Sequence, residues 1–208
     1  MNRATIAAVV LAGVLAGVAT AFVFMRAQPA PPALERATRF EAARPLPAIA
    51  LQDQSGQAFD LARMRGHWTL LFFGFTNCPD VCPMTLATLA ETRRQLADLP
   101  PDEIPEVVLA TVDPARDTPA ALARYVAHFD PSFTGLTGSQ DAIDALARDL
   151  GVAIMIGAPA ADGNYTVDHS AAVFLIDRGA AFTALFSAPH DAGTIARDYR
   201  RIVAARAR

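Results

Sequence analysis

The segment that most restricts the fold of this chain is a continuous apolar run from Thr69 to Phe75, TLLFFGF. A strand with one face in water alternates apolar with polar residues, whereas a strand buried on both faces forms an unbroken hydrophobic run. The run therefore predicts a central strand in a sheet that helices cover. Val107 to Val112 has the same character and predicts a second buried strand.

Helix and turn signals alternate with these strands. Leucine spacing predicts a helix over Thr85 to Leu99, and capping residues begin two more, Thr118 to Phe129 and Ser139 to Leu150. The remaining expected elements are a hairpin turning at Gln54 to Gln57, a strand pair at Ala171 to Ile176 and Ala181 to Phe186, and a last helix capped by Asp191. This order predicts an α/β fold, a mixed sheet flanked by helices with an N-terminal β-hairpin.

Composition narrows the functional classes. Hydrophobic residues make up 52% of the chain and charged residues 19%, which excludes a disordered protein. The net charge of -3 leaves no basic surplus to neutralise phosphates, so we do not expect nucleic acid as a partner. Two cysteines are too few for a disulfide-rich secreted domain.

The first part of the chain predicts export from the cytoplasm. Ala4 to Met25 has no charged residue over 22 positions and would span about 33 Å as a helix, enough to cross a bilayer. A cleaved signal sequence is the alternative, because Ala19-Thr20-Ala21 matches a cleavage site, but most signals have a shorter apolar run. We therefore divide the chain into a membrane anchor or signal (residues 1–26), a Pro- and Ala-rich tether (27–45) and a folded domain (46–208).

Either form of export places the folded domain outside the cytoplasm, in an oxidising compartment. We expect a single-pass protein of a bacterial-type cytoplasmic membrane, with the C-terminal domain facing the periplasm.

Both cysteines lie in the short segment GFTNCPDVCP, directly after the most hydrophobic strand. Cys78 and Cys82 are four residues apart, so on a helix both sulfurs would share one face. That face would lie above the carboxyl end of the sheet, where α/β proteins bind ligands. The positive end of the helix dipole would favour thiolate over thiol, and with it nucleophilicity and affinity for a soft metal.

Structural roles are the alternatives for this pair. A Cys78–Cys82 disulfide would close a loop so short that it removes only about 2 kcal/mol of unfolded-chain entropy, and helical pairing would strain it. Two buried free thiols are a second possibility. Among functional roles, the CxxxC spacing does not separate a redox dithiol from a metal site.

A histidine favours the metal site. His169 precedes the strand expected at Ala171 to Ile176, and in a thioredoxin-type sheet this loop abuts the cysteines. Two thiolates and one imidazole suit copper, because thiolate selects Cu(I) and imidazole also accepts Cu(II). We expect the other histidines, His67, His128 and His190, to be solvated.

Three acidic residues are further candidates for the site. Asp113 follows a strand at its carboxyl end, where it could orient a ligand or partner; Asp117 or Thr118 would cap the next helix. Asp80, between the cysteines, suits a helix start, and Asp168 could be a hydrogen-bond partner of His169 or an exposed turn residue.

Four segments in order, GFTNCPDVCPMTL, TVDPARDTP, GLTG and YTVDHSAAVFLID, resemble the Sco/SenC family of membrane-anchored, thioredoxin-like copper proteins. The resemblance covers about residues 45 to 207. It implies one copper held by Cys78, Cys82 and His169, with Asp113 at an acidic position of the family pattern. It also implies a metallochaperone that receives copper from a donor protein and delivers it to the binuclear copper site of cytochrome c oxidase subunit II.

A second function stays open beside copper delivery. A thiol-disulfide reductase would use Cys78 as the attacking thiolate and Cys82 as the resolving thiol to keep the acceptor cysteines reduced. The CxxxC spacing disfavours it, because familiar redox pairs are CxxC. A thioredoxin-like peroxidase would need a Thr and an Arg around one cysteine, and Thr76 is the nearby candidate.

Overall fold

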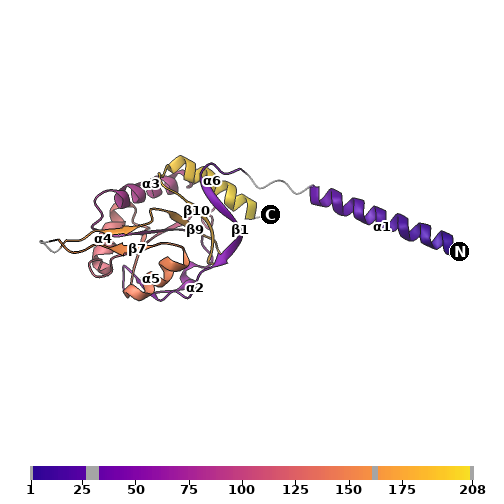
Figure 1. Ribbon diagram of the computed structural model, residues 1–208. Helices are drawn as coiled ribbons and strands as arrows, with labels where there is room; N and C mark the ends of the chain where they lie inside the picture. Colours follow the sequence, from indigo (N-terminus) through magenta and orange to yellow (C-terminus); the bar gives the residue numbers. More distant parts are fainter. Residues whose placement is uncertain (1, 27–32, 161–163, 207–208) are drawn as a thin grey trace. The chain divides into compact units, whose positions relative to one another are not determined.

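The computed structural model describes residues 2–26, 33–160 and 164–206. The chain divides into two compact units, residues 1–33 and residues 34–208. The first unit contains helix α1 (Arg3–Arg26). The second contains all the strands and the other helices, which form a sheet with helices packed on it (Figure 1).

Among the described residues, a search for a helix long and apolar enough to cross a membrane finds none. The membrane anchor expected from residues 1–26 is therefore not confirmed and stays a prediction.

Eight strands form the main sheet in the order β1-β10-β9-β4-β5-β6-β2-β3. The β4–β5 and β5–β6 pairs are parallel and the others are antiparallel. A separate hairpin pairs β7 with β8. The strands are β1 (Ala37–Pro45), β2 (Leu51–Asp53), β3 (Ala58–Phe59), β4 (Thr69–Gly74), β5 (Glu106–Thr111), β6 (Thr134–Thr137), β7 (Ile154–Ile156), β8 (Val167–His169), β9 (Val173–Ile176) and β10 (Ala181–Phe186).

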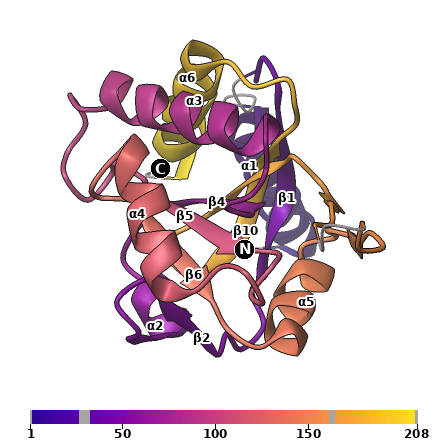
Figure 2. The same cartoon turned by 90° about the vertical axis from the view of Figure 1, so that its left-hand side faces the viewer.

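Helices cover both faces of the sheet. Helix α3 packs against α6 and α4 on one face, and α5 lies on the other (Figure 2). This arrangement follows from the right-handed β4-α3-β5 and β5-α4-β6 crossovers, which step in the same direction and place both helices on one side. The helices of the second unit are α2 (Leu61–Met64), α3 (Val81–Gln95), α4 (Pro119–Phe129), α5 (Gln140–Asp149) and α6 (Ala192–Arg206).

The central strand confirms the main sequence prediction. Every residue of β4 is buried, and the strand pairs with β5 on one side and β9 on the other. The caps of α4 and α5 are also as expected, since Thr118 Oγ1 accepts from the N–H of Ala121 and Ser139 Oγ from that of Ala142. The predicted α/β sheet with a short N-terminal β-hairpin, β2–β3, is therefore confirmed.

The boundary of the folded domain differs from the prediction. Residues 37–45, assigned above to the tether, form β1, which pairs antiparallel with β10 at the edge of the sheet. The segment has no clear strand pattern because all nine of its residues are exposed or half-buried. Backbone pairing with β10 and the contact of Phe40 with Phe182 place it in the sheet. Residues 27–32, also assigned to the tether, lie outside the described part.

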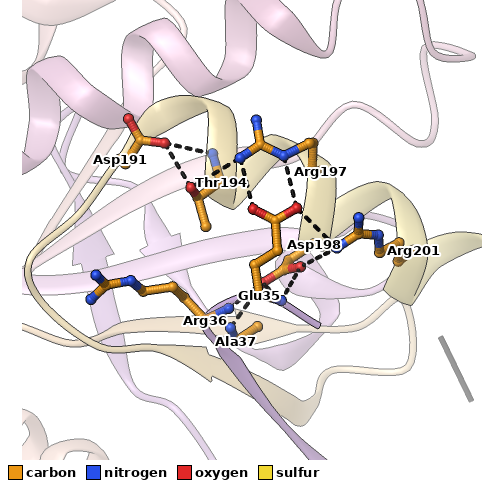
Figure 3. Close-up of polar contacts among 8 residues, drawn as sticks. All are labelled: Glu35, Arg36, Ala37, Asp191, Thr194, Arg197, Asp198 and Arg201. Atoms are coloured by element: carbon orange, nitrogen blue, oxygen red, sulfur yellow. Dashed lines mark hydrogen bonds and ion pairs between the residues drawn. The ribbon is translucent and has the colours of Figure 1, made fainter. Parts of the chain in front are cut away.

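A buried carboxylate ties the start of this domain to its last helix (Figure 3). Asp198 of α6 accepts hydrogen bonds from the backbone N–H groups of Glu35, Arg36 and Ala37, at N–O distances of 2.8, 2.9 and 2.9 Å. Burial alone would raise the pKa of Asp198, but these bonds and the Arg201 guanidinium outweigh it and lower the pKa below 3.8. The carboxylate is therefore ionised and holds the chain where β1 begins.

We expect Asp198→Ala to lower the free energy of unfolding by about 3 kcal/mol at neutral pH, because it leaves three N–H groups without their acceptor. Since the folded-state pKa of Asp198 is lowered, its contribution is present above the ordinary pKa of 3.8 and is lost as the pH falls below it. Denaturant unfolding at several pH values should therefore show that the free energies of unfolding of the wild type and Asp198→Ala become similar in acid.

The matched control for this prediction is Arg197→Ala. Arg197 lies on the same helix as Asp198, and the substitution removes its exposed ion pair with Glu35 and its hydrogen bond to the hydroxyl of Thr194, so we expect a change below about 1 kcal/mol. An equal loss in both variants would show that Asp198 has no special role.

Candidate metal centre

The cysteines flank the start of α3, at the carboxyl end of β4. Cys82 is the second residue of α3 and is fully buried, whereas Cys78 lies in the preceding loop and is partly exposed. The expectation that a helix would carry both is therefore wrong for Cys78. The two still meet, because the backbone N–H of Cys82 donates to Sγ of Cys78 at 3.4 Å, and both are free thiols.

Glycine at the end of β4 allows this packing. A Cβ atom at Gly74 would lie 3.1 Å from Sγ of Cys82 and 2.9 Å from Cε1 of Phe72, closer than ordinary contact. The sulfur of Cys82 can therefore lie directly against the end of the central strand because no side chain is present there.

Asp117 holds the loop that leads to Cys78, a role that its position before a helix does not indicate. Asp117 is not the cap of α4 but is fully buried, and its carboxylate accepts from the N–H and the hydroxyl of Thr76, at 3.1 and 2.5 Å, and from the hydroxyl of Thr111. Burial raises the pKa of Asp117, and the bonds from Thr111 and Thr76 oppose this shift. In the sequence, the only signal from Asp117 is its position just before a helix, and a capping role explains that position equally well.

His169 faces Cys82 from the neighbouring hairpin. Its Nε2 lies 3.8 Å from Sγ of Cys82, while Nδ1 lies 2.9 Å from the carbonyl oxygen of Ser170. A carbonyl can only accept, so Nδ1 carries the proton and the lone pair of Nε2 points toward the sulfur. Burial lowers the pKa of His169, although the Ser170 carbonyl and the charge of Asp168 oppose this, so the imidazole is neutral as a metal ligand must be.

The spacing of these donors suits a metal ion. Zinc, for example, binds sulfur at about 2.3 Å and nitrogen at about 2.0 Å. With a trigonal sulfur–metal–nitrogen angle, these bond lengths place the sulfur and the nitrogen about 3.7 Å apart. The 3.8 Å between Cys82 and His169 matches this separation. Within the described ranges, no group of three or more His, Cys, Asp or Glu side chains stands gathered as a metal site.

The protonation of Cys82 differs from the sequence expectation. We expected the helix N-terminus to favour thiolate, but burial raises the pKa of Cys82, and the contact with Cys78 raises it further. Desolvation outweighs the helix dipole here because the sulfur is fully buried. Cys82 is therefore a neutral thiol at pH 7, and binding a metal ion would release its proton.

The three acidic candidates have different surroundings. Asp113 is buried and accepts from the Arg116 guanidinium and, at 2.7 Å, from the hydroxyl of Tyr165. Asp80 is exposed at the N-cap position of α3 and makes no capping hydrogen bond with its side chain. Asp168 is exposed on β8 beside His169. Asp113 thus makes hydrogen bonds near the site, whereas Asp168 acts on His169 through its charge.

The remaining histidines are mostly as expected. His67 and His128 are exposed. The prediction that His190 is solvated is wrong. Its side chain is half-buried, and its Nε2 donates to the carbonyl of Ala171 at 2.7 Å. The fold places the loop after β10 beside the start of β9, a contact that residues so far apart in sequence do not reveal.

The chain is similar to known proteins over most of the folded domain. The SCO1/SenC family model matches residues 41–204. The mitochondrial SCO2 homolog of Mus musculus is 40% identical over 157 residues, 76% of this chain and 62% of that protein. The chain therefore spans less than two thirds of the length of this relative.

Two solved structures are similar over most of their length. ScoI of Bradyrhizobium japonicum with copper bound has 34% identity and a TM-score of 0.68, covering 76% of this chain and 99% of that one. ScoI of Arabidopsis thaliana with copper bound has 31% identity and a TM-score of 0.71, covering 76% and 98%.

The sheet, its helices and the thiols at the end of the central strand define a thioredoxin-like protein, whose buried cysteine faces a histidine. More narrowly, the chain belongs to the SCO1/SenC family.

The different surroundings of the two thiols lead to a reactivity prediction. In the folded, reduced protein, a maleimide should modify the lone Cys78 of Cys82→Ser at least about tenfold faster than the lone Cys82 of Cys78→Ser, because Cys82 is buried and its pKa is raised. In denaturant the two rates should become similar. Equal rates in the folded variants would contradict the burial of Cys82.

Proposed function

We propose that this protein binds one copper ion through the sulfurs of Cys78 and Cys82 and Nε2 of His169, and delivers it to another protein. The observation that carries the proposal is the pairing of Cys82 with His169, in which the imidazole lone pair points to a buried sulfur 3.8 Å away. Cys78 is the third donor in this proposal, since its sulfur lies next to Cys82 and accepts a hydrogen bond from the backbone N–H of that residue.

The donor set favours copper over other metals. Two thiolates and one imidazole select Cu(I) and also accommodate Cu(II), whereas a structural zinc site needs a fourth ligand. The aromatic rings of Phe72 and Phe75, each with its centroid 6.1 Å from that of His169, surround the imidazole with apolar surface that favours a soft, singly charged ion.

Unequal exposure of the ligands suits a protein that passes its metal on. Cys78 is partly exposed, while Cys82 is buried against β4. An incoming thiol from an acceptor can replace Cys78 first, while Cys82 and His169 still hold the ion. We propose the binuclear copper site of cytochrome c oxidase subunit II as the acceptor and a separate copper donor protein as the source, as the family resemblance implies.

A thiol-disulfide reductase is the second candidate, favoured by the same unequal exposure. The Cys78 sulfur would attack a disulfide of the acceptor and form a mixed disulfide, releasing one acceptor thiol. Cys82 would then displace the second acceptor thiol, leaving a Cys78–Cys82 disulfide. The two electrons gained by the acceptor come from this pair, which must be reduced again before it can bind Cu(I).

The site of action belongs to the same proposal. The uncharged run from Ala4 to Met25 supports export as an anchor or a cleaved signal, with residues 34–208 in the periplasm. A protease added to spheroplasts should then degrade the domain while cytoplasmic proteins survive. Protection of the domain until the cells are lysed would refute export.

Copper binding by the full chain, reduced and kept anaerobic in mild detergent, tests the main proposal. We expect one Cu(I) per chain in competition with a chromophoric chelator. Cys78→Ser and Cys82→Ser should each lose it, since each removes one of two thiolates, and His169→Ala should weaken it strongly. His128→Ala, which changes an exposed histidine away from the site, is the matched control and should bind like the wild type.

The outcomes separate the two functions. Wild-type affinity in His169→Ala would remove the histidine from the site and refute the three-donor centre. Reduction of an oxidised acceptor peptide by the metal-free protein, abolished in Cys78→Ser, would support the reductase instead.

A further inference from the structure

The two segments that carry the proposed copper ligands belong to different sheets. The cysteines follow β4 of the main sheet, whereas His169 ends β8 of the separate β7–β8 hairpin. The strand pairing described for this hairpin joins β8 to β7, with Ile154 opposite His169. Three residues, 170–172, then join His169 to β9, whose Val173 pairs with Phe72 of β4. The main sheet therefore holds the chain on the C-terminal side of His169, and side-chain contacts hold it on the N-terminal side.

One side chain reaches both segments. Arg116, in the loop between β5 and α4, has its guanidinium carbon 3.7 Å from the ring centroid of Tyr165, and one of its N–H groups donates to the Tyr165 carbonyl at 3.2 Å. The same guanidinium carbon lies 5.8 Å from the ring centroid of Phe75, which precedes the cysteines. Tyr165 stands four residues before His169.

Asp113 binds both partners of the contact between Arg116 and Tyr165. It is buried, and it accepts hydrogen bonds from both the Arg116 guanidinium and the Tyr165 hydroxyl. The carboxylate thus holds the arginine in place and binds the tyrosine directly. A buried carboxylate needs such partners, and here one of them, Tyr165, comes from the segment that leads to His169.

We propose that Asp113, Arg116 and Tyr165 form a clamp that positions His169 over Cys82. The clamp acts through the hairpin backbone, so its members are positioning residues and not ligands. The inference rests on the proposed copper site and assigns it three supporting residues. It also explains why an ion pair stands at this end of the sheet without contacting the thiols.

Copper affinity in a double-mutant cycle tests the clamp. Tyr165→Ala removes the ring and the hydroxyl from Arg116 and Asp113, and we expect about a ten- to a hundredfold loss of Cu(I) affinity, the usual range for residues that orient a ligand. In a His169→Ala background the same substitution should have no further effect, because there is no imidazole left to position. Tyr165→Phe, which keeps the ring over Arg116, should lose less.

A merely structural role gives a different pattern. Ile156→Ala truncates an exposed side chain on the same hairpin and is the matched control, expected to bind like the wild type. The Cu(II) form adds a spectroscopic readout, since the thiolate-to-copper absorption of Tyr165→Ala should move toward that of His169→Ala. Arg116→Lys keeps the charge beside Asp113 but not the flat contact with Tyr165, and should reproduce the loss without unfolding the protein.

The results distinguish failure of the clamp from failure of the site. Wild-type affinity in Tyr165→Ala and Arg116→Lys, with His169→Ala weakened, would refute the clamp alone. A loss from Tyr165→Ala that adds in full to the loss from His169→Ala would also refute it. If His169→Ala binds copper like the wild type, the proposed three-donor site is itself refuted.

Discussion

The close packing of Cys82 against the end of β4 is the contact on which the site depends. A Cβ atom at Gly74 would lie 3.1 Å from the Cys82 sulfur, so the absence of a side chain there lets the sulfur pack against the strand. Helix α3 begins at the end of this fully buried strand. The neighbouring parallel strand, β5, ends at the same edge, so the loop after it supplies Asp117 to the cysteine loop and Arg116 to the hairpin. The edge of a parallel sheet thus gathers loops that are distant in sequence.

Burial then sets the chemistry of these groups. It raises the pKa of Cys82 and of Asp117 and lowers the pKa of His169, so each shift favours the neutral form. The site therefore avoids uncompensated buried charge when no metal is bound. A bound cation would reverse this preference for the sulfur, because a thiolate beside a metal ion is no longer an isolated charge. Binding is consequently coupled to proton release, and affinity should rise with pH.

The two halves of the site are supported by different parts of the fold. The thiols follow the main sheet and are supported by β4, α3 and Asp117. His169 ends β8 of a two-stranded hairpin, which is held by side-chain contacts before His169 and by its short connection to β9 after it. Such a division places the imidazole against the rings of Phe72 and Phe75, both of which are buried. It also separates the stability of the fold, which depends on contacts such as Asp198 with the start of β1, from the properties of the metal centre.

The sequence by itself determined the buried strands, helices α4 and α5 with their caps, and the closeness of Cys78 to Cys82, because apolar runs, capping residues and short spacings are local signals. The tertiary structure decided what depends on contacts between distant segments. It placed β1 in the sheet by backbone pairing, turned Asp117 from a cap into a buried anchor, and brought His190 out of solvent. It also reversed the expected ionisation of Cys82, since desolvation depends on everything packed around the sulfur, whereas the helix dipole can be anticipated from the chain alone.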